Sequence, residues 1–383
     1  MPQASPRGSG IGDPERGSVT RRDIDIARWR LAHQQLLTPI LTQPGEVVRR
    51  LGAVQAQDYA GAKWAVGMRA RGAVDAVVEQ ALSDGSIVRT HVLRPTWHFV
   101  TPADIRWMLA LTAPRVKAAM AHYDRQLGLD AAVFRRSHAA LTRALRDGRQ
   151  LTRAELAHVL RRGRVDVTGS QRLGHVLMRA ELEGLVCSGA RRGKQATYAL
   201  LEERVPPAAP LDRDAALLEL TGRYFATRGP ATAQDFAWWS GLTLADVRRG
   251  VEIAGRRLER EVIGDETYWL ARSARSPRKR SRTAHLLPNY DEYFIGFKNR
   301  SAIGKRLNST DIVMGRDALT PHVIVVDGQL VGGWKRTLTK TAVVVELRVR
   351  ADLRASEKQA VVVAAQAFGD FLELPVELRR APS

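Results

Sequence analysis

The sequence predicts an α+β protein in which tandem winged-helix (helix-turn-helix) domains precede a small C-terminal β-barrel. Sets of helices, each followed by a short hairpin, recur along the chain up to residue 271. Beyond residue 283 the apolar residues alternate as in strands, and a single helix closes the chain. The formal net charge of +20 over 383 residues indicates a polyanionic partner, and nucleic acid is the usual one.

These signals divide the chain into segments joined by a Pro-rich linker at 205–210. The expected segments are a disordered leader at 1–22, an N-terminal winged helix at 23–125, a second winged helix at 126–205, a third at 211–271, a basic linker at 272–282 and a β-barrel with a C-terminal helix at 283–383. The basic linker contains no acidic residue, so it is either a solvated tether or a contact to the DNA backbone.

The N-terminal domain has the least regular pattern. Its expected elements are helices at 24–37, 44–54 and 62–70 and paired strands at 87–93 and 95–100. Thr101 then starts a further helix with Pro102 at its first position, where the missing N–H does no harm. Gln55 and Gln57 lie between the second and third helices, outside regular helical structure.

The second domain has the clearest pattern. Its expected elements are helices at 131–146, from Thr152 and at 171–183, and strands at 185–187 and 196–200. Thr152 and Glu155 have the spacing of a capping box, in which both side chains satisfy amide N–H groups at a helix start. The last helix of such a unit normally enters the major groove, and the basic turn at 191–194 would meet the phosphate backbone.

The third domain repeats this order with two further capping boxes. Thr232 precedes Asp235 by three residues, and Thr243 precedes Asp246 in the same way. The expected hairpin loop at 262–267 is acidic, which makes it a poor phosphate contact. We therefore expect this copy to have a structural role. In the last segment, Asp327-Gly328 predicts a hairpin between two strands, and a helix is expected at 356–371.

Composition excludes several classes of protein. A single cysteine, Cys187, rules out an internal disulfide and a cysteine-rich zinc site, and the nine histidines show no close paired spacing. The leader at 1–22 lacks the apolar run of an export signal, and no apolar span or basic amphipathic helix points to a membrane. We expect an intracellular, reduced protein that uses no metal and no cofactor.

The pair Gln55 and Gln57 is the most informative feature for function. Residues two apart point to opposite sides of a helix but to the same side of an extended segment. Their carboxamides donate and accept hydrogen bonds without titrating, so they could hold a water molecule or a base edge but could not remove a proton alone. By itself the pair is more often an ordinary pair of surface amides.

The number of winged helices bears on the kind of DNA-binding protein. A transcription factor normally uses one such unit and dimerises across a palindrome. Three units and a barrel in one chain favour a single-chain clamp around one site, which suits an enzyme or a repair factor. A non-catalytic regulator and an accessory protein whose glutamines contact base edges remain the alternatives.

Several segments, in this order, resemble the AlkZ/YcaQ-type DNA glycosylases over residues 23–380. They are Val54-Gln-Ala-Gln-Asp58, Leu93-Arg-Pro-Thr-Trp-His-Phe-Val100, Leu286-Leu-Pro-Asn-Tyr-Asp-Glu-Tyr293 and Gly296-Phe-Lys-Asn-Arg300. The resemblance implies a C-shaped array with an open cleft and excision of N7-alkylated purines. Gln55 and Gln57 match the Gln-x-Gln form, which is similar to the branch that unhooks interstrand crosslinks.

The implied reaction suits an amide pair. An N7-alkylated purine is already cationic and can leave without an acid, through a transition state that resembles an oxocarbenium ion. Gln55 and Gln57 would orient the attacking water through their carbonyl oxygens. Asp58 would add charge stabilisation or act as a base, or else serve as a helix cap or ion-pair partner. Because no lysine occupies the motif, we expect a monofunctional enzyme without lyase activity.

The remaining expected site residues fall into two groups. The candidate DNA contacts are Lys63, Trp64, Arg191, Arg192, Lys194, Arg278, Lys279, Arg280, Lys298 and Arg300. Trp64 is an equally good core residue, given its aliphatic neighbours. The residues expected to support the site structurally are His98, Asp291 and Tyr293. The expected partner is double-stranded DNA with alkylated purines, bound by a cytoplasmic, nucleoid-associated monomer.

Overall fold

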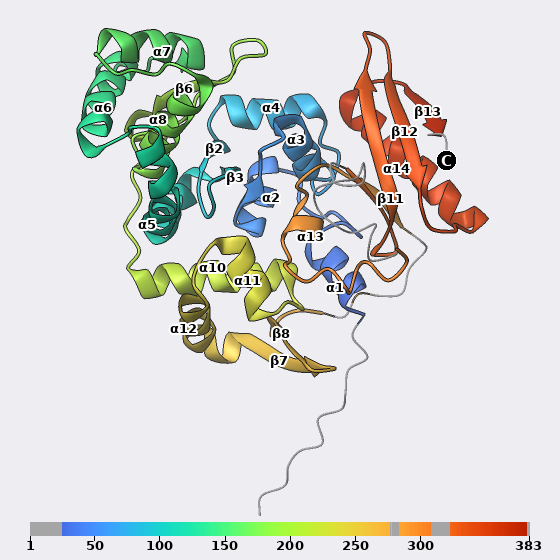
Figure 1. Cartoon of the computed structure of the whole chain (residues 1–383). Coiled ribbons are helices and arrows are strands. Elements are labelled where there is room, and N and C mark those ends of the chain that lie inside the picture. The colour runs from blue at the N-terminus through green and yellow to red at the C-terminus, as the bar shows by residue number, and fades with distance from the viewer. Residues whose placement is uncertain (1–24, 276, 278–282, 308–321, 381–383) are drawn as a thin grey trace, which may run out of the picture.

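The computed structural model describes residues 25–275, 277, 283–307 and 322–380. It is a mixed α+β fold, as the sequence predicts (Figure 1). The expected leader, most of the basic linker and the DNA contacts Arg278, Lys279 and Arg280 lie outside the described residues. For description we group the elements into a first unit (α1–α5), a second (α6–α9), a third (α10–β8) and a C-terminal unit (β9–β13).

The first unit lies at the centre of the molecule (Figure 1). Its elements are α1 (Ile26–His33), α2 (Pro44–Leu51), β1 (Val54–Gln55), α3 (Tyr59–Gly67), α4 (Asp75–Ser83), β2 (Val88–His91), β3 (Trp97–Val100) and α5 (Pro102–Gln126). The strands form a sheet of order β1-β3-β2. Pro102 begins α5 as expected, whereas α4 was not predicted and adds carboxylates beside α3.

The second unit has the same order of helices and strands as the first unit from α2 to α5. Its elements are α6 (Ala131–Leu145), β4 (Leu151–Thr152), α7 (Arg153–Arg162), α8 (Ser170–Leu182), β5 (Val186–Ser188), β6 (Thr197–Leu200) and the short α9 (Leu201–Arg204). Its sheet order, β4-β6-β5, also places the last strand in the middle. The predicted capping box is present, with Thr152 accepting from the Glu155 N–H and Glu155 accepting from the Thr152 N–H.

The third unit lies on the opposite side of the first unit from α6 and α7 (Figure 1). Its elements are α10 (Arg213–Arg228), α11 (Ala233–Ser240), α12 (Leu244–Ala254), the 3-10 turn η1 (Gly255–Arg257), β7 (Leu258–Ile263) and β8 (Glu266–Ala271). Both predicted capping boxes, Thr232 with Asp235 and Thr243 with Asp246, are present. The two strands form a hairpin of their own.

The C-terminal unit corrects the expected β-barrel. Its elements are β9 (Ala284–Leu287), α13 (Glu292–Ile295), β10 (Val323–Val326), β11 (Gln329–Leu338), β12 (Val343–Val349), α14 (Ala355–Leu372) and β13 (Val376–Arg380). Over the described residues they form one open sheet of order β13-β12-β11-β10-β9. The helix α14 leads into β13, which pairs parallel to β12, so the two end strands lie at opposite edges. Alternation along a strand cannot distinguish an open sheet from a closed one.

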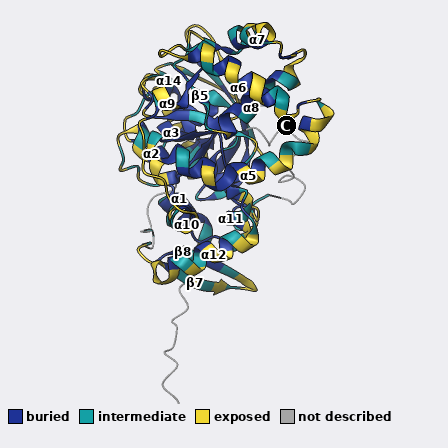
Figure 2. Cartoon of the chain, turned by 90° about the vertical axis from the view of Figure 1, so that its left-hand side faces the viewer, coloured by how far each residue is buried: buried dark blue, intermediate teal, exposed yellow. Residues whose placement is uncertain are grey.

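The units share their hydrophobic cores. Trp64 of α3 contacts Phe368 and Phe371 of α14, with ring centroids 5.2 and 5.1 Å apart, and belongs to one cluster with Trp334 of β11. A second cluster joins the first, second and third units around α5, α10 and α11. Buried residues therefore gather between the units, and exposed residues occupy the outer turns of helices such as α6 and α12 (Figure 2). This packing places side chains from distant segments around β1.

Candidate active site

Gln55 ends a two-residue edge strand that is fixed on one side by β3. Val54 pairs with Phe99 and Gln55 with His98. The preceding helix α2 stops at Gly52, whose φ of 81° is a left-handed conformation that favours glycine. The Gln55 side chain is 6% exposed, while Gln57 lies beyond the strand end and is exposed. The segment is therefore extended at Gln55, as predicted.

Two charged groups hold Gln55. Its backbone N–H donates to Glu292 Oε1 at 2.9 Å, and its side-chain Oε1 accepts from Arg94 Nη2 at 2.6 Å. Arg94 lies in the loop between β2 and β3, and Glu292 is the first residue of α13. Both lie inside segments on which the family resemblance rests, but sequence alone assigned neither of them a contact to Gln55.

Gln57 is held more loosely. Its Oε1 accepts a long hydrogen bond of 3.4 Å from the Trp97 N–H. No hydrogen bond joins the carboxamides of Gln55 and Gln57 within the described part of the chain. The two amides thus differ: Gln55 is buried and fixed, whereas the Gln57 carboxamide is open to solvent.

Asp58 occupies the structural position that the sequence left as one of two alternatives. It is the N-cap of α3 and accepts from the Gly61 N–H at 3.0 Å. Its carboxylate also lies 3.2 Å from Nη2 of Arg336, a residue of β11. A Cβ at position 61 would lie 2.6 Å from Asp58 Oδ2, so a larger residue there would require the Asp58 carboxylate to shift. These contacts fix Asp58, the N-cap of α3, which directly follows Gln57.

Lys63 and Trp64 are corrections to the expected DNA contacts. The Lys63 side chain is 7% exposed, and its ammonium lies 2.7 Å from both Asp75 and Glu79. It is therefore satisfied within the protein by carboxylates of α4, the helix that was not predicted. Trp64 is 5% exposed and its indole donates to Leu286 O at 2.7 Å. Trp64 is a core residue, the alternative that its aliphatic neighbours favoured.

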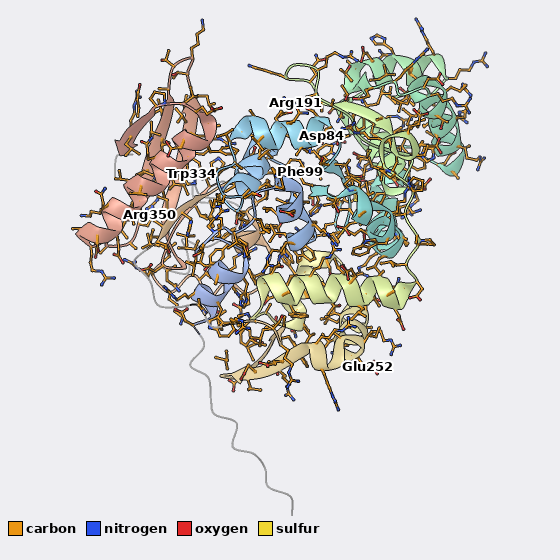
Figure 3. All side chains as sticks on the ribbon, turned by 180° about the vertical axis from the view of Figure 1, so that it is seen from behind. Asp84, Phe99, Arg191, Glu252, Trp334 and Arg350 are labelled. Carbon is orange, nitrogen blue, oxygen red and sulfur yellow. The ribbon has the colours of Figure 1, made fainter. Side chains whose placement is uncertain are left out.

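The basic loop between β5 and β6 reaches the first unit beside α3 and α4 (Figure 3). Arg191 lies over the Tyr59 ring, with 4.7 Å between guanidinium carbon and ring centroid, and 3.7 Å from Glu79. Tyr59 donates to Glu79 at 2.9 Å, and burial raises the pKa of its phenol. The loop thus contacts the residue that follows Asp58, a contact that sequence reasoning missed because it joins two units.

The other expected DNA contacts differ in exposure. Lys194 and Lys298 are exposed. Arg192 is largely exposed and forms an ion pair with Glu155 at 2.8 Å. Arg300 is half-buried, because its guanidinium lies over the Phe294 ring and its Nε donates to Phe294 O. Among the described candidates, the two lysines are therefore the most accessible to a phosphate.

The three residues expected to support the site are all buried. His98 is fully buried, and its Nδ1 lies 2.9 Å from Thr96 O. Burial, reinforced by the charge of Arg94, lowers the pKa of His98 well below its usual value. Asp291 accepts two hydrogen bonds of 2.8 Å from Arg69. Tyr293 donates its hydroxyl proton toward the carbonyl oxygens of Ala27 and Gly328.

In residues 25–275, 277, 283–307 and 322–380, no three His, Cys, Asp or Glu side chains gather closely enough to hold a metal ion. Within the same ranges, no helix combines the length and the apolar content needed to cross a lipid bilayer.

Comparison with known proteins defines the class of the protein as a DNA glycosylase, which sets aside the non-catalytic alternatives. The family model described as DNA glycosylase AlkZ-like matches residues 48–371, so the chain belongs to the AlkZ-like DNA glycosylase family. This confirms the resemblance read from the motifs.

One characterised relative and one solved structure agree with the family assignment. The chain is 27% identical over 371 residues to an interstrand DNA cross-link repair glycosylase of Streptomyces sahachiroi, with 88% of this chain and 95% of the relative covered. Its fold is similar to the solved structure of the Streptomyces sahachiroi DNA glycosylase AlkZ. That match has a TM-score of 0.74 at 23% identity and covers 92% of this chain and 98% of the other.

Proposed function

We propose that this enzyme hydrolyses the N-glycosidic bond of N7-alkylated purines in double-stranded DNA and unhooks interstrand crosslinks between them. The observation that carries the proposal is the contrast within the amide pair. Gln55 is buried and held by two charged groups, and Gln57 is open to solvent two residues later. A fixed amide beside an accessible one can bind a water molecule without accepting its proton.

The proposed chemistry needs little proton transfer. Alkylation at N7 makes the purine a cationic leaving group, so the transition state gathers positive charge on the deoxyribose. Gln57 Oε1, which is only weakly engaged by Trp97, can accept a hydrogen from the attacking water. Gln55 Oε1 uses one of its two lone pairs for Arg94, and its other lone pair remains for the same water.

The contacts of Asp58 support a structural role in this proposal. Its carboxylate caps α3 and lies beside Arg336, so its lone pairs are already directed to donors. We propose that Asp58 fixes the backbone next to Gln57. The competing role, a general base for the water, predicts a much larger loss of activity when the carboxylate is removed.

The crosslink substrate is supported by the similarity to the interstrand DNA cross-link repair glycosylase of Streptomyces sahachiroi and by local geometry. A crosslinked nucleotide is tethered to the opposite strand and cannot be flipped into a deep pocket. The cavity lined by Tyr59, Trp97 and Arg191 does not include Gln55 or Gln57. We propose that the enzyme reads its substrate in an open cleft of a C-shaped array, with the first three units acting as winged helices.

DNA binding is proposed to rest on exposed cations. Lys194, Arg192 and Lys298 would contact the backbone, and the net charge of +20 would make binding strongly salt-dependent. We propose that the enzyme acts as a monomer without metal or cofactor, in the cytoplasm and close to the nucleoid.

The test is base release from defined duplexes. Purified enzyme is incubated with a duplex that carries one 7-methylguanine, or one N7 crosslink, and heated alkali then converts abasic sites to strand breaks. We expect breaks with the wild type and none with the Q55A/Q57A double variant, whose affinity for undamaged duplex should stay within about twofold. Equal losses of binding and activity would make the pair a DNA contact. Absence of base release from both duplexes would overturn the proposal.

A further inference from the structure

We propose that Glu292 and Arg94 are positioning residues that hold Gln55 at its two ends, and that Arg228 and Trp239 of the third unit hold Glu292. The proposal rests on the proposed catalytic role of Gln55 and deepens it. Buried charged residues from three units meet at this point, and together they fix the Gln55 carboxamide.

The backbone contact replaces a missing strand. Among the described strands β1 pairs with β3 alone, so one side of its backbone has no strand neighbour there. On that side, Glu292 Oε1 accepts a hydrogen bond from the Gln55 N–H at 2.9 Å. The next amide, Ala56 N–H, faces β3 and donates to Trp97 O at 2.7 Å. A carboxylate 237 positions later in the chain thus fixes the backbone from which the catalytic amide projects.

Glu292 is itself fixed from the third unit. Its Oε2 accepts from Arg228 Nη2 at 2.5 Å and from Trp239 Nε1 at 2.8 Å. The Arg228 guanidinium lies 4.2 Å from the centre of the Trp239 ring. The Glu292 carboxylate therefore accepts hydrogen bonds from three residues, Gln55, Arg228 and Trp239. Water cannot reach this ion pair, because the Glu292 and Arg228 side chains are 0% exposed.

Arg228 also controls the approach to β1. Its Nη1 donates to Leu51 O at 2.8 Å and its Nη2 lies 3.3 Å from Ala53 O. Leu51 is the last residue of α2, so the guanidinium satisfies a helix-end carbonyl on one side of Gly52 and a strand-entry carbonyl on the other. One side chain thereby fixes the turn that delivers Gln55.

The side-chain end of Gln55 is fixed by Arg94. A guanidinium only donates hydrogen bonds, so the group 2.6 Å from Arg94 Nη2 is the carbonyl oxygen and not the amide nitrogen. The rotamer and the sense of the carboxamide are thereby both determined. A polar group that is already oriented needs no reorganisation when charge develops in the transition state.

Stability alone is a poor explanation for this arrangement. Burying an ion pair removes two charges from water, and apolar residues of the same volume often serve a fold equally well. Glu292 supplies what an apolar residue cannot, which is a directed acceptor for the Gln55 N–H. A misplacement of about 1 Å in such a group can lower a reaction rate about 100-fold.

The neighbouring Asp291 provides a matched control. Asp291 and Arg69 form a second fully buried pair, one residue away. Asp291 also accepts three hydrogen bonds, two from Arg69 and one from the Tyr293 N–H, but it does not contact Gln55. In E292Q and in D291N alike, a carboxamide with one acceptor oxygen replaces a carboxylate that serves three donors.

The experiment compares E292Q with D291N under single-turnover conditions at saturating enzyme, alongside melting temperature and affinity for undamaged duplex. We expect similar losses of melting temperature and affinities within about twofold of wild type, but a rate of base release at least about tenfold lower in E292Q than in D291N. Equal rates in the two variants would overturn the positioning role of Glu292, while the proposed function would stand as long as wild type cleaves and Q55A/Q57A does not.

A second pair of variants covers the case in which E292Q fails to fold. R94M removes the donor to Gln55 Oε1, and R94K keeps a cationic donor at the same position. We expect R94M to lower the single-turnover rate about tenfold and R94K to restore it to within about threefold of wild type, both with unchanged duplex affinity. A wild-type rate in R94M, or equal rates in R94M and R94K, would show that Arg94 does not orient the amide.

Discussion

The guanidinium carbon of Arg191 lies 4.7 Å from the centre of the Tyr59 ring, so the β5–β6 loop of the second unit touches the residue that follows the Gln-Ala-Gln-Asp segment. Arg191 also lies 3.7 Å from Glu79, which accepts the Tyr59 hydroxyl proton. A loop expected only to contact DNA therefore also packs against the start of α3. If this loop binds DNA as proposed, its contact with Tyr59 would couple DNA binding to the position of α3.

Replacement of Arg191 by alanine should lower the rate of base release as well as DNA affinity. The variant loses a cation–π contact of about 0.5–1 kcal/mol and leaves the Tyr59 ring uncovered. Lys194→Ala, in the same loop but exposed, is the control and should affect only salt-dependent affinity. Single-turnover rates and binding isotherms at several salt concentrations separate the two effects. Identical profiles for both variants would contradict the coupling.

Lys63→Met should destabilise the fold without changing phosphate contacts. The ammonium lies 2.7 Å from both Asp75 and Glu79, so its loss removes charge-assisted hydrogen bonds worth about 1.5–3 kcal/mol and leaves two carboxylates facing each other. Denaturant unfolding measures this loss. The dependence of log affinity on log salt should keep its wild-type slope, whereas a slope lower by about one unit would show that Lys63 does contact phosphate.

Asp58→Asn should keep most of the activity. Asparagine caps a helix about as well as aspartate, whereas Asp58→Ala removes the cap and should cost about 1 kcal/mol of stability. We expect the rate of base release in D58N to stay within about tenfold of wild type. If Asp58 were a general base, D58N would lose about 100- to 10,000-fold, and the pH–rate profile would lose its acidic limb.

The free energy of unfolding should fall as the pH drops below 6.5. Burial lowers the pKa of His98 well below 6.5 and lowers the pKa values of His285 and His322 to about 4. These histidines are neutral in the folded protein but take up protons near pH 6.5 once unfolded, so the unfolded state gains protons first and is favoured by acid.

Each such histidine contributes a slope of up to about 1.4 kcal/mol per pH unit between the unfolded pKa and the folded one. Chemical denaturation between pH 7 and pH 4.5 measures the combined slope. His285→Gln removes one of these titrating groups and should flatten the profile in this window. A profile that keeps the wild-type slope in H285Q would contradict the assignment.

Local signals in the sequence predict local structure well. The three capping boxes form because each needs only two side chains three residues apart, with no help from distant segments. The helix at 102–126 likewise follows from Pro102, and the turn after β10 follows from Asp327-Gly328, where both residues have positive φ. The expected elements of the second unit differ from the structure by one or two residues.

Contacts between units are what the sequence does not reveal. The misplacement of Lys63 follows from the missed helix α4, since without α4 no carboxylate is expected near that ammonium. The Gln-x-Gln segment stands out in the sequence, but Glu292 joins it across 237 positions, a distance over which no spacing rule applies. Over the described residues an open sheet stands in place of the predicted barrel for the same reason, because closure depends on how β13 pairs.

With the proposed catalytic role of Gln55, its anchoring by Glu292 and Arg228 would make activity depend on three units of the chain at once. A small displacement of α13 from the centre of the molecule would abolish base release while the loops proposed to bind DNA stay folded. On gentle heating, the activity should therefore be lost at a lower temperature than the one at which the protein unfolds. The inactive protein should still bind DNA.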